Sequence, residues 1–138
     1  MALGLRIPRH LFEEMLAHAR KELPHECCGL LSGDPATGEV TRLHRLVNSA
    51  ASPSRYFAEE KSLLAAFRAM RDEGTELLAI YHSHPDSAPA PSRTDLADNF
   101  YGEEVVHFII SLKGKEPFVQ GWHLAETGFR AADWECLG

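Results

Sequence analysis

The stretch ELLAIYHSHPDSAPAPSRTD, residues 76–95, contains the pattern around which the rest of the chain can be read. Its first part, residues 76–84, is a continuous apolar run that ends in two histidines one residue apart. Such a run indicates a strand buried on both faces, so we expect a central strand here. The second part is rich in proline and forms a loop that carries Ser92 and Asp95.

Helical and extended patterns alternate on either side of this stretch. Apolar residues four apart predict a helix over residues 7–23, and a second helix is expected over 58–74 with Gly74 as its stop. A short helix over about 92–101 follows the proline-rich loop. Short apolar or alternating runs predict further strands over residues 26–34, 38–48, 104–112, 118–126 and 128–136. We therefore expect an α/β (α+β) fold, one domain over residues 1–138 with a mixed central sheet flanked by helices.

Composition narrows the class of protein. The chain has 138 residues, 44% hydrophobic and 25% charged, which is typical of a globular domain, and its net charge of -6 disfavours nucleic-acid binding. No stretch approaches the roughly 20 apolar residues of a membrane span, and the N-terminal apolar run is too short for a secretory signal. Three cysteines make no disulfide framework, so we expect a cytoplasmic protein. A homodimer is compatible with the sequence, which does not fix the oligomeric state.

His82 and His84 have the spacing of metal ligands. Residues i and i+2 of a strand point to the same face, about 6.5 Å apart along the chain, so two imidazoles can lean onto one ion. Asp95 is the candidate third ligand, and the prolines stiffen the path that returns it. Two histidines and one carboxylate leave a tetrahedral position open for water, which predicts a catalytic site with one Zn²⁺ ion.

Simpler interpretations apply to each residue alone. A single histidine at a strand end is usually solvated or hydrogen-bonded, and Ser92 with Asp95 is also an S-x-x-D capping box at a helix start. The capping box does not exclude the metal site, and the combination favours it. Hydrolysis also requires a general base. Glu26, just before a short apolar run, is attractive for this role, although the chain has other acids.

The combined pattern resembles the JAMM (MPN+) metalloprotease family. His82-x-His84, seven residues and Ser92-x-x-Asp95 match its motif, together with Glu26 in the upstream segment HECCGLLSG. The resemblance implies that the histidines and Asp95 bind zinc and that Glu26 is the acid/base that activates the zinc-bound water. It also implies that Ser92 hydrogen-bonds the oxyanion or the site water. The implied fold resembles that of cytidine deaminases, but the deaminase signature H-x-E with P-C-x-x-C is absent.

The resemblance further implies a substrate. Family members cut peptide or isopeptide bonds after the C-terminal tail of ubiquitin-like proteins, and small prokaryotic members process sulfur-carrier proteins of ubiquitin-like fold. We therefore expect a ubiquitin-like or sulfur-carrier protein as the partner, with no nucleic acid and no membrane. Two alternatives stay open: a zinc hydrolase acting on small peptides or amides, and a non-catalytic MPN interaction module.

Overall fold

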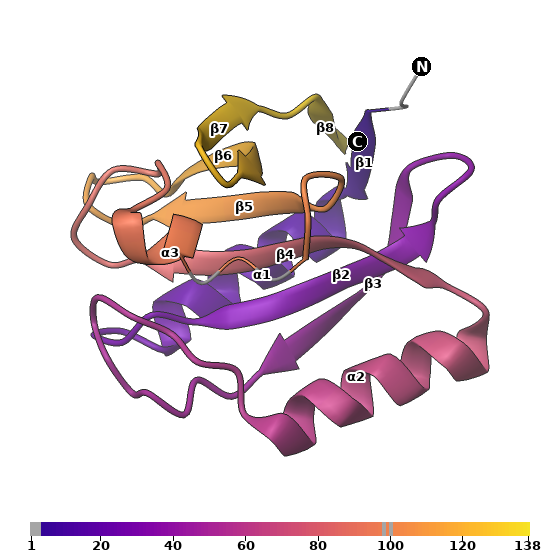
Figure 1. The fold of residues 1–138 in the computed structure, drawn as a ribbon, viewed down its shortest axis with the longest axis horizontal. Coiled ribbons are helices and arrows are strands. Elements are labelled where there is room, and N and C mark those ends of the chain that lie inside the picture. The colour runs from indigo at the N-terminus through magenta and orange to yellow at the C-terminus, as the bar shows by residue number, and fades with distance from the viewer. Residues whose placement is uncertain (1–3, 98, 100) are drawn as a thin grey trace.

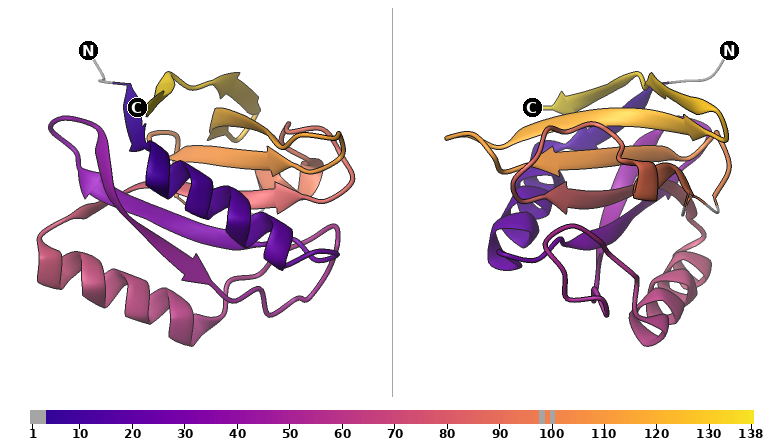
Figure 2. Two further views of the ribbon diagram at one scale, coloured as in Figure 1. Left: turned by 180° about the vertical axis from the view of Figure 1, so that it is seen from behind. Right: turned by 60° about the vertical axis from the view of Figure 1, so that its left-hand side comes forward.

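The structure of the protein, a computed structural model, describes residues 4–97, 99 and 101–138 (Figure 1). Along the chain its elements are β1 Leu5–Pro8, α1 Arg9–Lys21, β2 Cys28–Asp34, β3 Glu39–Leu46, α2 Glu60–Glu73, β4 Glu76–His84, α3 Arg93–Ala97, β5 Val106–Ser111, β6 Phe118–Ala125, β7 Gly128–Ala131 and β8 Trp134–Leu137. The two long helices pack on different parts of the sheet, as the views in Figure 2 show. This arrangement confirms the predicted mixed sheet flanked by helices.

Within the described residues, eight strands form one sheet in the order β7-β6-β5-β4-β2-β3-β1-β8. The predicted central strand, β4, lies in the interior, antiparallel to β2 and parallel to β5. In this register Cys28 of β2 pairs with His82, and Ile109 of β5 pairs with His82 from the other side. The end of β4 that carries the histidines is thus held from both sides.

The sheet is strongly curled. Strands β7 and β8 are neighbours in sequence, yet they lie at opposite ends of the strand order. Trp134 of β8 meets the ring of Phe108 in β5 edge-on, with centroids 4.9 Å apart, and a side chain at Gly121 of β6 would collide with the same indole. The single strand expected over 128–136 is therefore wrong, because the chain crosses there from one end of the sheet to the other.

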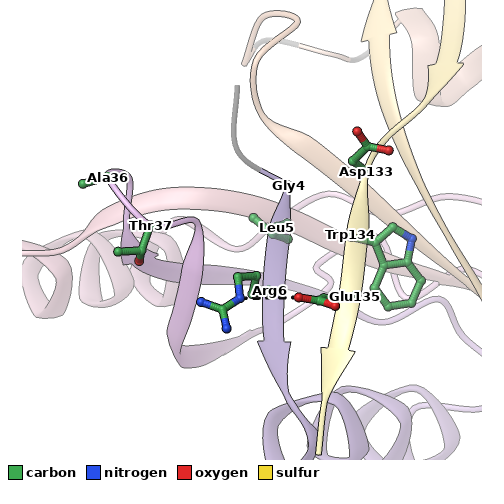
Figure 3. Close-up of a pocket in the computed structure, with 8 residues that line it drawn as sticks. All are labelled: Gly4, Leu5, Arg6, Ala36, Thr37, Asp133, Trp134 and Glu135. Carbon is green, nitrogen blue, oxygen red and sulfur yellow. Dashed lines mark ion pairs between the residues drawn. The ribbon is translucent and has the colours of Figure 1, made fainter. Parts of the chain in front are cut away.

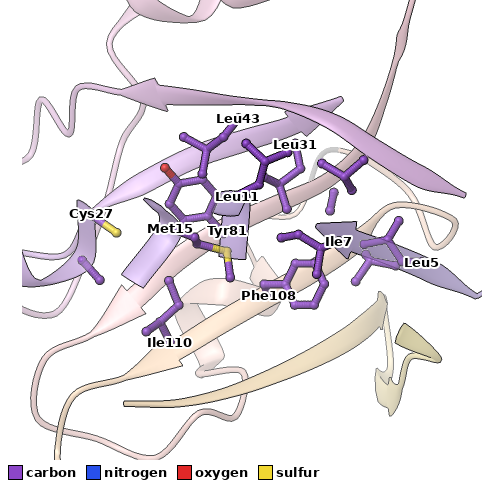
Figure 4. Close-up of a cluster of buried hydrophobic side chains, with 14 residues drawn as sticks. Leu5, Ile7, Leu11, Met15, Cys27, Leu31, Leu43, Tyr81, Phe108 and Ile110 are labelled. Carbon is purple, nitrogen blue, oxygen red and sulfur yellow. The ribbon is translucent and has the colours of Figure 1, made fainter. Parts of the chain in front are cut away.

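Two hydrophobic clusters lie on the two faces of the sheet. The first contains Met15 of α1 and fills the curl of the sheet (Figure 4). The second contains Ile80 of β4 and Met70 of α2. Because side chains alternate along a strand, His82 and His84 point to the same face as Ile80, the face that α2 covers.

The first helix begins later than its periodicity predicts. Ile7 was expected in this helix but belongs to β1, where it is fully buried and pairs with Cys136 of β8. Pro8 is extended, with φ -58° and ψ 144°, and the helix begins at Arg9. A strand of four residues shows too little alternation to be distinguished from a helical stripe, and the partner that defines it lies at the other end of the chain.

The other two helices follow the prediction more closely. Helix α2 ends where expected, with Gly74 at φ 69° in the left-handed region that glycine adopts without a steric cost. Helix α3 ends at Ala97, whereas the prediction extended to 101; Asp98 and Phe100 of that range lie outside the described residues. In the part of the chain that is described, no helix combines the length and the apolar character that a membrane crossing requires.

A surface pocket lies beside β1 and β8, away from β4. Figure 3 shows its lining, which includes Ala36 and Thr37 of the β2–β3 turn and Trp134. Arg6 and Glu135 form an ion pair of 3.5 Å beside it. The pocket shares no residue with the predicted zinc site and therefore belongs to a different part of the molecule.

Candidate active site

The candidate site lies where β4 ends and the proline-rich loop begins. The side chains of His82 and His84 are almost completely buried, with 1% and 5% of their surface exposed. Asp95 lies on the short helix α3, and the loop between them brings its carboxylate back to both rings. The structure thus brings together all three residues that the sequence predicts as metal ligands.

Three donor atoms form a nearly equilateral triangle. The Nε2 atoms of His82 and His84 lie 3.1 Å apart, and each lies 3.2 Å from Oδ2 of Asp95. A tetrahedral zinc ion with bonds of about 2.0–2.1 Å places its ligand atoms about 3.3 Å apart. The spacing and the chemistry of this donor set therefore fit a zinc ion, and they could hold one without rearrangement of the strand.

The tautomer of His84 follows from its second nitrogen. Nδ1 of His84 donates a hydrogen bond to the carbonyl of Ala88 at 2.8 Å, which leaves Nε2 free to present its lone pair to the centre of the triangle. Two more carbonyls of the loop accept hydrogen bonds from the sheet: that of Ser87 from the Ser111 hydroxyl, and that of Pro89 from the Trp122 indole. These three hydrogen bonds anchor the loop between His84 and Asp95.

Ser92 and Asp95 form the capping box that the sequence predicts. The Asp95 N–H donates to Oγ of Ser92 at 3.0 Å, and the Ser92 N–H donates to Oδ2 of Asp95 at 2.9 Å. Since Oγ accepts from the backbone, its own proton stays available, and Ser92 is exposed to solvent. One residue can therefore both cap α3 and present a hydroxyl near the candidate metal ligands.

Burial and hydrogen bonds shift the pKa values of Asp95 and His84 in opposite directions. Burial alone would raise the pKa of Asp95, but hydrogen bonds with His82 and His84 outweigh it and hold that pKa well below its usual range. For His84, burial would lower the pKa, and its hydrogen bond with Asp95 turns the shift upward. The carboxylate is therefore negative and attracts a cation or a proton to the centre.

Glu26 is a buried acid next to this centre. Only 3% of its surface is exposed, and its Oε1 has no hydrogen-bond partner among the described residues. Burial raises the pKa of Glu26 to about 8; the charge of His84 opposes the shift and that of Asp95 adds to it. A carboxyl group with a pKa near neutrality can both accept and donate a proton, as an acid/base catalyst must.

Two site residues were not found from the sequence. The ring of Tyr56 stacks on His82, with centroids 4.8 Å apart and planes inclined by 28°. Asn48 donates from Nδ2 to the carbonyl of Glu26 at 3.0 Å. Both lie in an irregular segment with no periodic pattern, so no sequence signal distinguished them from ordinary loop residues.

Three other buried titratable groups lie in or beside the sheet. Cys27 and Cys28 are buried free thiols in different hydrophobic clusters, and burial raises the pKa of each to about 12. His107 is buried, and desolvation together with the charge of His82 lowers its pKa to about 4. These groups stay neutral near pH 7 and contribute no charge to the site.

Comparison with known proteins places this geometry in a family context. Residues 8–124 match the family described as prokaryotic homologs of the JAB domain. A probable TtuB-protein conjugate cleaving protease of Thermus thermophilus is 43% identical over 97 residues, which cover 70% of this chain and 64% of the relative. A CysO-cysteine peptidase of Mycobacterium tuberculosis is 37% identical over 92 residues, which cover 67% and 63%. The matched part of the chain thus spans less than two thirds of these curated relatives.

Solved structures share the fold. A protein of Desulfitobacterium hafniense superposes with a TM-score of 0.87 at 31% identity, covering 96% of this chain and 92% of that one. A JAB1/MPN domain protein of Archaeoglobus fulgidus gives a TM-score of 0.65 at 21% identity, with 97% and 98% covered. The second likeness confirms the predicted MPN-type fold.

Proposed function

The chain belongs to the family of prokaryotic JAB-domain proteins, and from this we propose that it is a zinc-dependent peptidase of the JAMM type. Its substrate is a ubiquitin-like or sulfur-carrier protein, cut at the bond that follows the C-terminal tail. The observation that carries the proposal is the triangle of His82, His84 and Asp95 beside the buried acid Glu26. The names of the curated relatives support this substrate class.

In the proposed mechanism the three ligands hold one Zn²⁺ ion. When bound, zinc supplies a Lewis acid for the scissile carbonyl and lowers the pKa of water to about 7. Asp95 contributes the negative charge, and His84 is oriented by the carbonyl of Ala88.

Glu26 moves the proton. Its unpartnered Oε1 takes a proton from the attacking water and returns it to the leaving amine, so one group serves as base and then as acid. Burial raises the proton affinity of Glu26 above that of an exposed carboxylate, which favours capture of the proton from water. The Ser92 hydroxyl donates a hydrogen bond to the oxygen on which negative charge develops.

The substrate assignment rests on the need for remote binding. The site holds few groups that recognise a scissile bond, so specificity comes from an extended tail and from a folded body docked nearby. We expect small tail residues, because so little of His82 and His84 is exposed that a bulky side chain beside the scissile bond would meet the surrounding residues. The three free cysteines suit a reducing compartment, in keeping with a cytoplasmic location.

The test compares two substrates. We measure kcat/KM for a ubiquitin-like protein with a C-terminal extension and for the isolated tail peptide. We expect the intact protein to react far faster, bulky residues in place of the tail glycines to abolish cleavage, and a chelator to stop the reaction. Equal values for protein and peptide would instead support a hydrolase of small peptides. No turnover by the zinc-loaded protein would support a non-catalytic module.

A further inference from the structure

We propose that residues 48–57, here called the clamp, position both the acid/base and one zinc ligand of the site. Within the clamp, Tyr56 is a positioning residue for His82, and Asn48 ties the same segment to the backbone of Glu26. The inference rests on the proposed zinc site, because it concerns how that site is held in shape.

The two histidines are oriented in different ways. Nδ1 of His84 is hydrogen-bonded to a carbonyl, whereas Nδ1 of His82 is buried with no hydrogen-bond partner among the described residues. Metal-binding imidazoles are usually oriented by a hydrogen bond at the second nitrogen. At His82 that bond is missing, and the stacked ring of Tyr56 covers the imidazole instead.

Tyr56 also packs against the hydrophobic core. It is half-buried and packs against the hydrophobic cluster that includes Cys28, Ile80 and residues of α2. The ring is therefore wedged between this core and His82. A ring fixed in this way limits rotation of the imidazole about its side-chain bonds, and this keeps Nε2 directed at Asp95.

Asn48 organises the clamp through all of its side-chain groups. Its Oδ1 accepts from the N–H groups of Ala50 and Phe57, at 3.0 and 2.9 Å. Its Nδ2 donates to the carbonyls of Arg55 and Glu26, at 3.1 and 3.0 Å. One side chain thus fixes the residues on both sides of Tyr56 and reaches across to the acid/base.

The backbone of Glu26 is bound to the clamp from both of its polar groups. Its carbonyl accepts from Asn48, and its N–H donates to the carbonyl of Ser52 at 2.8 Å. Ala51, between these two, has a φ of 44°, a left-handed conformation that alanine rarely adopts. Strained residues persist where the surroundings over-determine them, and they concentrate at functional sites.

The first experiment measures zinc affinity by competition with a chelator, without substrate. Tyr56→Phe keeps the ring and should bind zinc within about twofold of the parent. Tyr56→Leu removes the ring and should bind about tenfold more weakly or worse, as loss of an outer-shell partner typically does. Phe118→Leu is the matched control, because Phe118 lies on β6 outside the clamp and is 57% exposed, and its zinc affinity should be unchanged. Parental affinity in Tyr56→Leu, or an equal loss in Tyr56→Phe, would overturn the role of the ring.

A second variant tests the clamp if Tyr56→Leu folds poorly. Asn48→Asp keeps the Oδ1 acceptor and removes the Nδ2 donor. It should lower both zinc affinity and kcat while leaving the far-UV circular dichroism unchanged, and parental values of both would contradict the proposal. The affinities need no substrate, so a failure to cleave any ubiquitin-like tail leaves the clamp supported. A parent that binds no zinc would overturn both proposals.

Discussion

His82 and His84 face each other through Nε2 atoms that lie only 3.1 Å apart. Nδ1 of His84 donates its proton in the hydrogen bond to the carbonyl of Ala88. In a neutral His84, Nε2 therefore presents a lone pair to this contact. Nε2 of His82 can donate a hydrogen bond to that lone pair, or both nitrogens can bind one shared cation.

Replacing His84 should greatly weaken zinc binding without unfolding the protein. His84→Ala has two ligands left, which hold zinc far more weakly than three, so the purified variant should contain little zinc. The measurement is zinc content by atomic absorption, beside a circular dichroism spectrum. His10→Ala, an exposed position on α1, is the control and should carry zinc like the parent. Full zinc occupancy in His84→Ala would remove His84 from the ligand set.

Replacing Glu26 should separate catalysis from metal binding. Glu26→Gln keeps the shape and removes the basicity, so kcat should fall by about 10²–10⁴ while zinc is retained. The control is Glu13→Gln on the exposed side of α1, which should leave both unchanged. If zinc is lost together with activity, Glu26 acts on the metal and not on the proton.

A thermal unfolding curve and a measurement of kcat together decide the role of Ser92. As a cap alone, Ser92→Ala would cost about 1 kcal/mol of stability and leave turnover nearly unchanged. As an oxyanion donor it should lower kcat by roughly 10²-fold or more with KM little altered. Ser92→Thr keeps the hydroxyl and should recover most of both properties. A lower melting temperature with normal kcat would leave Ser92 as a helix cap only.

The contribution of His18 to the stability of the fold should decline as the pH falls from 6.5 to 4. His18 is buried and shares a hydrogen bond of 2.6 Å with the Tyr81 hydroxyl, and burial with the charges of Arg45 and Lys21 lowers its pKa to about 4. In this window His18 binds a proton in the unfolded chain but not in the folded chain. The contribution of His18 is therefore fully present above pH 6.5 and declines below it, by up to about 1.4 kcal/mol per pH unit.

Urea unfolding of the metal-free protein at pH 7 and pH 5 measures this loss. His18→Gln should lose less stability between the two pH values than the parent, and His10→Gln on the same helix should behave like the parent. The remaining pH dependence is a sum of opposite signs. His107 and His44, whose pKa values are lowered, cost stability as the pH falls, whereas Glu26, whose pKa is raised, adds stability. An unchanged loss in His18→Gln would show that His18 is not the titrating group.

Gly29 should tolerate no side chain. A Cβ at this position would overlap the ring of Tyr81, which lies flat over the glycine in the adjacent strand. Overpacking of this kind typically costs about 1–3 kcal/mol, so Gly29→Ala should lower the free energy of unfolding by an amount in this range or larger. Gly128→Ala is the matched strand control, since nothing lies within 4 Å of a Cβ there. Equal melting temperatures for the two variants would contradict the argument.

The candidate ligands could be predicted because their relation is local. His82 and His84 are two residues apart on a strand whose apolar run predicts it, and strand geometry alone puts both rings on one face. Ser92 and Asp95 are three residues apart, and the capping box fixes their relation in the same way. Residue type and short-range spacing were therefore sufficient for this part of the site. Glu26 lies more than fifty residues upstream of His82. Its position before an apolar run made it one candidate base among several acids, and the family resemblance favoured it over the others.

Other features depended on contacts between segments far apart in the chain. Neither the short strand β1 nor the break before Trp134 could be predicted, because both depend on the curl that brings the ends of the sheet together. Tyr56 meets His82, and Asn48 meets Glu26, only after β2 and β4 have paired and the loop after β3 has folded back over them. Such contacts have no period in the sequence. The sequence by itself determined which side chains are candidates for the chemistry, and the tertiary structure decided which ones hold them in place, since that support comes from packing across the sheet.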